Sequence, residues 1–404
     1  MMLIPDCSTP VVVLRVHHGS LGIARSLGRL GVPVHAVHSD LRSPALRSRF
    51  WRGRHLWEFD RADPRRSVAW LLELGATLGQ RALLIPTADD LAELVAAHAS
   101  ELGECFLFQD NPLGLVRALA SKKDLYHLLR HHGFPTAETC FPGSVADVRR
   151  FSETATYPVM LKASDGLRQE ARTGRRMVIA RTPQELLDWY QRLEDPENPN
   201  LMLQEYIPGE DERKMWLFDG CFDGNSECLM GITARKLRSF PVHAGATSLG
   251  MCERNDILYD QSLRFMKAIA YRGIVGMDYC WDSRDGTYKL LDPNPRIAAN
   301  FRVFVGANGL DVVRCLYLHL TGQPVPKTEA VEGRKWVVED TDFDSFRDYR
   351  SEGALSVGRW LRSLAGIREA AWFASDDLAP ALGVARGLAQ RLFHRIIKPW
   401  TIRR

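Results

Sequence analysis

Short apolar segments alternate with segments of helical pattern through the first part of this chain. Apolar runs with the length of buried strands lie at residues 11–14, 34–37, 82–86 and 106–108. Segments with helical spacing fall between them, at residues 23–30, 69–78 and 89–97. Strands that alternate with helices favour a parallel sheet with helices packed on it. We therefore expect an α/β domain at the N-terminus.

The turn after the first strand bears on whether this domain binds a cofactor. Residues 17–22 read HHGSLG, which lacks the full G-x-G-x-x-G spacing of a dinucleotide site. The pattern predicts a Rossmann-like unit, and a structural role of the turn is favoured over dinucleotide binding. His17 and His18 stand at a strand end where α/β domains often bind ligands, and a turn position without a role is the favoured alternative.

Composition narrows the class of protein. The formal net charge of +4 is small for 404 residues and argues against a dedicated nucleic-acid binder. The eight cysteines are scattered without a C-x-x-C pair, which indicates a reduced protein rather than a disulfide or zinc scaffold. The N-terminus lacks the pattern of a secretory leader, and no apolar run reaches the roughly 18 residues of a membrane span. We expect a cytoplasmic protein.

One segment of the C-terminal half has side chains that are typical of a binding or reaction site. Residues 290–296 read LLDPNPR, which places Asp292, Asn294 and Arg296 on alternate residues. On an extended strand these side chains would point the same way. Carboxylate and amide oxygens suit Mg²⁺, and a guanidinium suits a phosphate or carboxylate. The prolines exclude a central strand and indicate a strand end, with a polar surface turn as the alternative.

A second acid lies upstream of this segment. Residues 273–279 read as a strand, GIVGMDY, that contains Asp278. The Asp-Gly pair at 285–286 predicts a hairpin, with a return strand at 288–291. A hairpin can bring Asp278 close to Asp292 and Asn294. Two acids and an amide around Mg²⁺ and phosphate oxygens are what a nucleotide-dependent phosphoryl-transfer site needs.

Three further features precede the hairpin. Lys122 stands at a helix start, and Lys162 ends the apolar strand YPVMLK of residues 157–162. Residues 204–207 read QEYI and end another strand. In this order and spacing, the two lysines, the QEYI strand and the hairpin resemble the ATP-grasp superfamily. The resemblance covers the chain from the first strand to about residue 325.

The resemblance implies ATP as a substrate and one or two Mg²⁺ ions, with Mn²⁺ as a substitute. It implies that the two lysines hold the α- and β-phosphates, that the QEYI strand reads adenine, and that Asp211 binds the ribose, with Glu210 as the alternative. The expected ATP contacts are Lys122, Lys162, Gln204, Glu205, Ile207 and Asp211. The expected metal ligands are Asp278, Asp292 and Asn294.

The resemblance also implies a fold and a domain order. We expect an α/β and α+β protein of ATP-grasp fold, preceded by the Rossmann-like domain at residues 1–115. The ATP-grasp core would cover residues 116–325, with a small lid subdomain at about 134–203 and a C-terminal subdomain at about 204–325. Residues 326–404 would form a C-terminal helical extension.

Two features depart from the family pattern. The segment 163–175, which closes over the phosphates in such enzymes, is expected to be polar and flexible and has only two glycines, Gly166 and Gly174. Its added arginines could replace main-chain contacts or recognise an anionic substrate. The second metal acid is Asp292, where glutamate is more common.

Two neighbouring motifs narrow the resemblance. ARKLRSFP at 234–241 and HAGAT at 243–247 resemble carboxylate–amine ligases of the D-aspartate ligase type. This implies amide-bond formation through an acyl phosphate, with release of ADP and phosphate. The expected catalytic residues are Arg235, Lys236 and Arg296. Arg302 is a further candidate, and pairing with an acid near Asp311 is its alternative.

The implied partners are a small-molecule carboxylate and an amine, with amino acids favoured, and no nucleic acid. One alternative is an ATP-grasp enzyme that uses a nucleophile other than an amine. Another is a non-catalytic ATP-binding regulatory protein. Whether the protein forms a homodimer is left open.

The C-terminal segment has its own pattern. Residues 382–397 have helical spacing, with Leu388, Leu392 and Ile396 on one face and arginines nearby. A basic amphipathic helix of this kind can lie on an anionic membrane. Docking of the apolar face on the protein's own core is the favoured reading.

Overall fold

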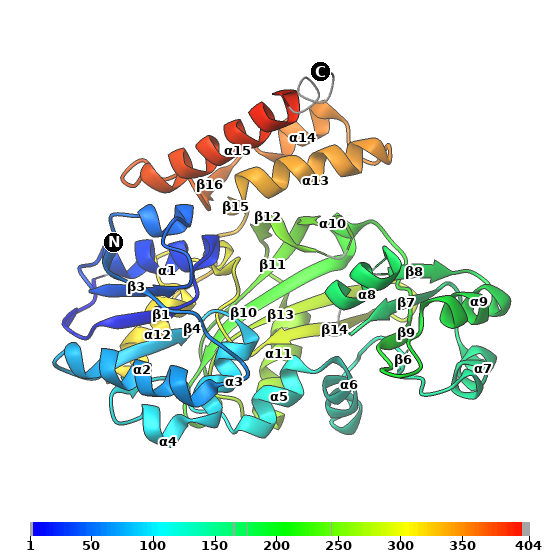
Figure 1. Cartoon of the computed structure of the whole chain (residues 1–404), viewed down its shortest axis with the longest axis horizontal. Helices are drawn as coiled ribbons and strands as arrows, with labels where there is room; N and C mark the ends of the chain where they lie inside the picture. The colour runs from blue at the N-terminus through cyan, green and yellow to red at the C-terminus, as the bar shows by residue number, and fades with distance from the viewer. Residues whose placement is uncertain (1–2, 165, 176, 244, 398–404) are drawn as a thin grey trace. The chain divides into compact units, whose positions relative to one another are not determined.

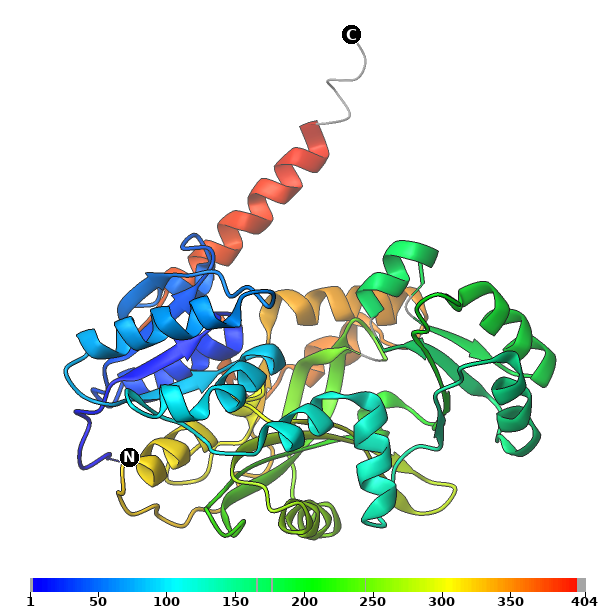
Figure 2. The ribbon, with the colours of Figure 1, turned by 60° about the horizontal axis from the view of Figure 1, so that its bottom comes forward.

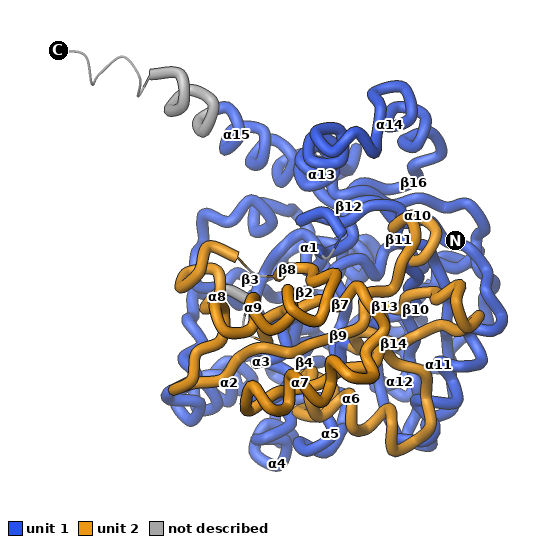
Figure 3. Tube along the Cα trace, turned by 90° about the vertical axis from the view of Figure 1, so that its right-hand side faces the viewer, with its two compact units in different colours: residues 1–116, 215–277, 294–404 blue, residues 117–214, 278–293 orange. Residues whose placement is uncertain are grey.

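The computed structural model describes the backbone of residues 3–164, 166–175, 177–243 and 245–397 (Figure 1). The chain divides into two compact units (Figure 3). Unit 1 comprises residues 1–116, 215–277 and 294–404, and unit 2 comprises residues 117–214 and 278–293. The mixed α/β and α+β fold class is confirmed. The domain boundaries expected from the sequence group the residues differently and stay a prediction.

Unit 1 begins with a five-stranded sheet of order β3-β2-β1-β4-β5, in which every neighbouring pair is parallel. Its strands are β1 (Val11–Leu14), β2 (Val34–His38), β3 (Trp51–Leu56), β4 (Ala82–Pro86) and β5 (Phe106–Leu107). Its helical segments are α1 (His18–Gly28), η1 (Pro44–Arg47), α2 (Pro64–Thr77), α3 (Asp89–Ala97), α4 (Ala99–Leu102) and the start of α5 (Leu113–Ala120). The four strands expected from the sequence are confirmed. The sequence does not predict β3, because WRGRHL is mostly polar and forms the sheet edge.

Helix α1 begins before the predicted Ile23 because a local pair of hydrogen bonds starts it at His18. The Nδ1 atom of His17 accepts from the N–H of Gly19 at 3.0 Å, and the hydroxyl of Ser20 accepts from the N–H of His17 at 3.2 Å. This is the reciprocal geometry of a capping box, with histidine at the cap. His17 therefore has a structural role in the turn.

The first turn of α1 lies directly against another backbone segment of unit 1. A Cβ atom on Gly19 would lie 2.6 Å from the Cα atom of Ala299 and 2.9 Å from its carbonyl oxygen. Side chains do not fit at such distances, so only glycine permits this packing. The structural role favoured for the HHGSLG turn follows from this contact.

Helix α3 begins without a polar cap. Its N-cap is Ala88, which makes no side-chain hydrogen bond. The hydroxyl of Thr87 instead donates to the carbonyls of Leu14 and Arg15, at 2.9 and 2.8 Å. It thereby ties the end of β4 to the end of β1.

A seven-stranded sheet has the order β14-β13-β10-β11-β12-β15-β16. Its strands are β10 (Met215–Phe222), β11 (Cys228–Phe240), β12 (Ala246–Cys252), β13 (Gly273–Asp282), β14 (Thr287–Asn294), β15 (Lys335–Val337) and β16 (Ile367–Ala370). Helices α11 (Asp256–Ala268) and α12 (Val312–Leu320) contact β10 and β11, and the short η2 (Phe301–Val303) contacts β12. The last strand, β14, contains Pro293 and lies at the sheet edge, as the prolines require.

Unit 2 contains a four-stranded sheet of order β6-β9-β7-β8 with antiparallel pairs. The strands are β6 (Thr139–Cys140), β7 (Val159–Ala163), β8 (Met177–Ala180) and β9 (Leu201–Glu205). The helices are α6 (Lys122–His131), α7 (Val145–Thr154), α8 (Gly166–Thr173), α9 (Pro183–Leu193) and α10 (Asp211–Lys214). Apolar residues of α7 and α9 form one core with the sheet.

The flexible loop predicted at residues 163–175 is wrong, because α8 occupies most of it. The side-chain amide of Gln169 donates to the carbonyl of Leu193 at 2.9 Å, and Arg168 pairs with Asp195. The segment GLRQEART consists mainly of good helix formers, so propensity alone could have indicated a helix. The predicted loop arginine Arg176 lies outside the described residues.

The C-terminal part of unit 1 contains helices and two strands of the large sheet. Its helices are α13 (Glu339–Ser351), α14 (Val357–Ser363) and α15 (Ala379–Ile397). Buried ion pairs connect it to earlier parts of unit 1: Arg25–Asp377 at 2.9 Å, Arg238–Asp342 at 2.8 Å and Arg302–Glu369 at 2.7 Å. Throughout the described residues, every helix falls short of the length and hydropathy that a bilayer crossing needs.

Candidate functional site

Lys162 and Gln204 meet on the four-stranded sheet of unit 2. Strands β7 and β9 pair so that Met160 lies opposite Gln204. The Nζ atom of Lys162 donates to Oε1 of Gln204 at 2.9 Å, and Nε2 of Gln204 donates to the hydroxyl of Thr139 at 2.9 Å. These two bonds fix the orientation of the Gln204 amide and hold the ammonium group beside it.

The electrostatics of Lys162 are unusual for a lysine. Burial and, after it, the ammonium of Lys122 lower its pKa to about 8, against the opposite effect of the Asp292 carboxylate. A buried ammonium flanked by a second one lacks sufficient negative charge. A bound polyphosphate would supply that charge.

Lys122 and Asp292 form an ion pair within unit 2. Lys122 is the first residue of α6, whose N-cap Ser121 accepts from the N–H of Asp124. The Lys122 and Asp292 side chains are 33% and 43% exposed, respectively. Each remains open to a second, incoming partner. The structure thus brings together Lys122, Lys162, Gln204 and Asp292, four of the predicted site residues.

Glu205 serves a different set of partners. Its carboxylate accepts from the N–H of Glu138 at 2.9 Å, from Lys289 at 2.7 Å and from Arg284 at 2.8 Å. Its own N–H donates to the carbonyl of Glu138 at 2.9 Å. Its side chain therefore anchors the strand, and its predicted contact with ATP stays a prediction.

The hairpin β13–β14 carries a charge cluster that sequence reasoning missed. Asp282 is fully buried and pairs with Arg284 at 2.5 Å and with Lys289 at 2.8 Å. The Arg284 hydrogen bond, followed by the Lys289 ammonium, holds the pKa of Asp282 well below its usual range. The DSRDG turn contained the signal, an acid two residues before an arginine.

Ile207 and Asp211 are connected through Lys214. The Nζ atom of Lys214 donates to the carbonyl of Ile207 at 3.0 Å and lies 3.6 Å from Oδ1 of Asp211. The same ammonium lies 5.0 Å from the ring centre of Tyr206, a cation–π distance. Lys214 therefore orders the segment in which both predicted nucleotide contacts lie.

The predicted metal ligands lie on two adjacent strands. Asp278 is half-buried in β13, and Asp292 and Asn294 are alternate residues of β14. Within the described residues, no group of three or more His, Cys, Asp and Glu side chains is arranged to hold a metal. The predicted set contains two carboxylates and one amide, hard oxygen donors that fit Mg²⁺ when phosphate and water complete its shell.

Arg296 is held within unit 1 by the carboxylate of Asp89, the first residue of helix α3. Its Nε atom lies 2.7 Å from Oδ1 of Asp89, and Nη2 lies 3.4 Å from Oδ2. Nη2 also donates to Oδ1 of Asn294 at 2.9 Å. Sequence reasoning missed this role of Asp89, because more than two hundred residues separate the partners.

Arg235 and Lys236 are neighbours on β11 and have different surroundings. Arg235 pairs with Glu253 at 2.6 Å, whereas Lys236 is 5% exposed and its Nζ lies 3.4 Å from the carbonyl of Gly245. Successive residues of a strand point to opposite faces. The two side chains therefore cannot serve one substrate from the same face, although both were predicted to be catalytic.

Arg302 is held by structural ion pairs. It is buried and pairs with Asp311 and with Glu369, which also binds Arg334 at 2.6 Å. Burial opposes the charge, but the two carboxylates raise the pKa of Arg302 above its usual value. The alternative considered from the sequence, that Arg302 pairs with an acid near Asp311, therefore describes its environment.

His17 is neutral near pH 7. Burial and, after it, the neighbouring His18 lower its pKa to about 3. Its Nδ1 atom is engaged as the cap of α1, so the ring is an acceptor in a structural bond. The neutral His17 ring therefore has no charge with which to hold a substrate carboxylate.

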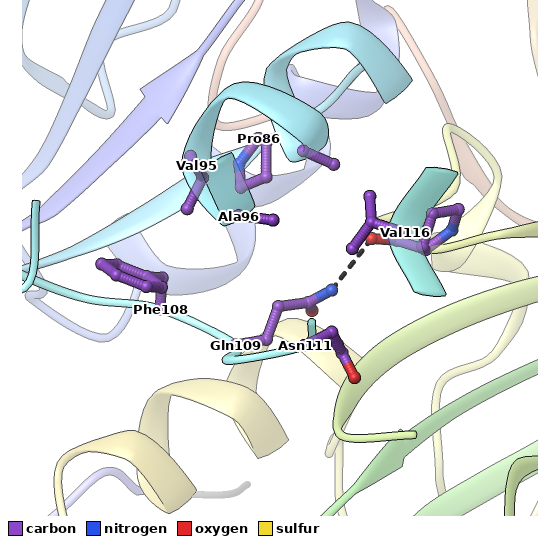
Figure 4. Close-up of a pocket in the computed structure, with 9 residues that line it drawn as sticks. Pro86, Val95, Ala96, Phe108, Gln109, Asn111 and Val116 are labelled. Atoms are coloured by element: carbon purple, nitrogen blue, oxygen red, sulfur yellow. Dashed lines mark hydrogen bonds between the residues drawn. The ribbon is translucent and has the colours of Figure 1, made fainter. Parts of the chain in front are cut away.

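A crevice in unit 1 lies beside the segment that carries Arg296 (Figure 4). It has room for about one water molecule. The side-chain amide of Gln109 crosses it and donates to the carbonyl of Pro295 at 2.9 Å. Its Oε1 accepts from the N–H of Ile274 at 2.9 Å. The crevice is too small for a substrate, and Gln109 braces the backbone next to Arg296.

The fold, the two lysines and the acidic hairpin define a protein of the ATP-grasp class. Residues 122–324 match the family described as the carbamoyl-phosphate synthase L chain, ATP binding domain. The match spans 203 of the 404 residues, about half of the chain, and the chain belongs to this family.

Relatives agree with this assignment. The chain is 26% identical to a D-aspartate ligase of Enterococcus faecium (strain Aus0004) over 307 residues, which are 72% of each protein. Its fold is similar to that of N5-carboxyaminoimidazole synthetase from Staphylococcus aureus, with a TM-score of 0.61, 12% identity and 80% of each chain covered. These relationships support an enzyme with ATP-dependent ligase activity.

A second solved structure has the same fold. It is the biotin carboxylase domain of the 2-oxoglutarate carboxylase from Hydrogenobacter thermophilus, in complex with MgADP, ADP and bicarbonate. The TM-score is 0.60 at 18% identity, with 79% of this chain and 71% of that chain covered. At this identity the similarity concerns the fold alone.

Proposed function

We propose that the protein is an ATP-dependent carboxylate–amine ligase that forms an amide bond through an acyl phosphate. The observation that carries the proposal is the cluster in unit 2, where the half-buried Lys162 lies beside Gln204 and Lys122 pairs with the partly exposed Asp292. Such a cluster lacks only a polyphosphate to balance its positive charge. The similarity to a D-aspartate ligase favours amino acids as substrates.

The reaction would proceed in two displacements. A carboxylate oxygen of the first substrate attacks the γ-phosphorus of ATP, and the bond to the bridging oxygen breaks to release ADP. The amine of the second substrate then attacks the acyl carbon, phosphate leaves, and the amine nitrogen loses a proton. No covalent bond to the protein forms in either step.

The side chains would have distinct roles. Lys122 and Lys162 would hold the phosphates, and Gln204 with the 205–207 segment would hold the base. Asp278, Asp292 and Asn294 would hold Mg²⁺, which would offset the negative charge of the phosphates. Arg296, kept in place by Asp89, would stabilise negative charge on the transferring phosphoryl group.

The experiment is ADP release with Mg-ATP against a panel of amino acids, alone and in pairs. A carboxylate labelled with ¹⁸O should transfer one labelled oxygen to the released phosphate. Asp292→Ala should abolish ADP release in a folded protein. Asp285→Ala is the matched control, because Asp285 lies on the same hairpin with a side chain that is 47% exposed. Unlabelled phosphate would contradict the acyl phosphate, and activity of Asp292→Ala would contradict the metal assignment.

One observation favours a second candidate, a non-catalytic ATP-binding regulatory protein. Helix α8 occupies the segment that a flexible, phosphate-covering loop was expected to fill. This candidate predicts tight ATP binding without ADP release for every substrate pair. An ATP-grasp enzyme with a nucleophile other than an amine predicts ADP release that depends on the carboxylate and on no amine.

A further inference from the structure

The C-terminal helix α15 exposes apolar side chains to solvent. Leu382, Ala385 and Ala389 follow the spacing i, i+3 and i+7 on α15, which forms one stripe on the helix, and Leu378 stands one residue before its start. Leu378 is 49% exposed, Leu382 is 67% exposed, and both alanines are exposed. We call these four residues the exposed stripe. Leu388, nearby on the same helix, is 42% exposed.

Another side of α15 packs on the protein. A Cβ atom on Gly383 would lie 3.2 Å from Cβ of Pro44 and 3.1 Å from Cδ of Arg47, both in η1. The glycine permits this close approach. Helix α15 extends away from the rest of unit 1 in Figure 2, and its start is anchored by the buried Arg25–Asp377 pair.

This arrangement is the reverse of the usual one. An amphipathic surface helix normally buries its apolar stripe against the core and exposes its polar face. Here a glycine side lies against η1, and the exposed stripe faces solvent. Of the apolar face predicted from the sequence, only the Leu388 side chain is described, and docking of that face on the protein's own core stays a prediction.

The sequence of this segment indicates the chemistry of a partner. From Leu378 to the C-terminus there is no Asp or Glu, and the six basic residues are Arg386, Arg391, Arg395, Lys398, Arg403 and Arg404. The same stretch contains Phe393 and Trp400. The predicted positions of Leu392 and Ile396 on the apolar face lie outside the described side chains. Leucine and aromatic residues interspersed with arginine are typical of helices that lie in a membrane interface.

We propose that α15 binds the surface of a membrane that contains anionic lipids. The exposed stripe enters the interface between headgroups and acyl chains, and the net positive charge of the segment attracts it to anionic headgroups. The helix lies on the bilayer and does not cross it. The inference is independent of the proposed ligase reaction, because it uses no residue of the nucleotide site.

The test is co-sedimentation of the full-length protein with vesicles of phosphatidylcholine alone and with vesicles that contain about one third phosphatidylglycerol. We expect binding to the anionic vesicles, and weaker binding at 0.5 M than at 0.05 M salt, because screening removes the contribution of the basic residues. Leu382→Asp with Leu388→Asp should weaken binding by about tenfold or more, because each charge must enter the interface.

A matched control is Ile257→Asp, because Ile257 on α11 is 67% exposed, as Leu382 is. It should bind vesicles as the unchanged protein does. Thermal unfolding of all variants should coincide, since every changed side chain is exposed. Failure of the unchanged protein to bind anionic vesicles would overturn the proposal, as would equal binding by the double variant. A stable dimer that the double variant abolishes, without vesicle binding, would assign the stripe to a second copy instead.

Discussion

At the scale of single residues, the lowered pKa of Lys162 predicts a pH dependence of nucleotide binding. The pKa of about 8 means that the free protein loses this charge as the pH rises through that value. Phosphates favour the charged form, so binding above pH 8 must also restore the proton. The dissociation constant for ATP should therefore rise by up to about tenfold per pH unit above 8.

Isothermal titration at pH 7, 8 and 9 measures this dependence. Lys162→Met should bind ATP more weakly and should lose the pH dependence in this range. If the dissociation constant of the variant still rose with pH, the titrating group would be one other than Lys162.

The Asp89–Arg296 pair predicts an effect on the chemical step. Asp89→Asn removes the charge that holds the guanidinium at 2.7 Å and should lower kcat by about 10- to 100-fold, as small misplacements of a catalytic group do. The KM for ATP should change little, because Asp89 belongs to no predicted nucleotide contact. Asp90→Asn is the control, since Asp90 pairs with Arg15 at 2.8 Å and not with Arg296. Equal losses in both variants would contradict a specific role of Asp89.

At the scale of elements, the hairpin β13–β14 depends on the buried Asp282. Asp282 is one of two carboxylates that hold both Lys289 and Arg284, the other being Glu205, so Asp282→Ala should lower the free energy of unfolding by about 2 kcal/mol. Asp285→Ala, which removes a more exposed carboxylate 3.3 Å from Lys289, should cost about 1 kcal/mol or less. Urea denaturation of both variants measures the difference.

The same carboxylate predicts a loss of stability in acid. The pKa of Asp282 in the folded protein lies below its ordinary value of 3.8. The stabilisation is therefore fully present above about pH 4 and is lost as the pH falls toward the folded value. Asp282→Ala should show a smaller decrease in stability below pH 4 than the unchanged protein. If the free energy of unfolding fell equally with pH in the variant and the unchanged protein, this assignment would be contradicted.

The elements show what the sequence could and could not predict. Apolar strands such as β1 and β4 were predictable because burial on both faces leaves a continuous apolar run. The polar edge strand β3 and helix α8 were missed, the first for lack of such a run and the second because its glycines and arginines suggested a loop. Asp89 lies far along the chain from its partner Arg296. Glu253, the partner of Arg235, follows the end of β12. No local pattern could have indicated those pairs.

At the scale of the whole molecule, the C-terminal part of unit 1 belongs structurally to the rest of that unit. Glu369 binds both Arg302 and Arg334, and its side chain is only 18% exposed. Glu369→Ala should lower the free energy of unfolding by about 3 kcal/mol, because it leaves two arginines without this partner.

Deletion of residues 390–404 should leave the unfolding temperature nearly unchanged, since the ion pairs at Glu369, Asp377 and Asp342 all precede the cut. Thermal unfolding of the two variants compares them. This view of the C-terminal part would be contradicted if the deletion lowered the unfolding temperature strongly and Glu369→Ala changed it little.

The contact of Gly19 with the backbone of Ala299 has a consequence for how mutational data on this protein will read. A library of all single substitutions should find Gly19 as intolerant as a residue of the reaction site, because any side chain meets the Ala299 Cα atom at about 2.6 Å. The neighbouring histidine cap should tolerate asparagine or serine, which accept the same hydrogen bond. Intolerance at position 19 beside tolerance at position 17 would record a contact between backbones, not a contact with substrate.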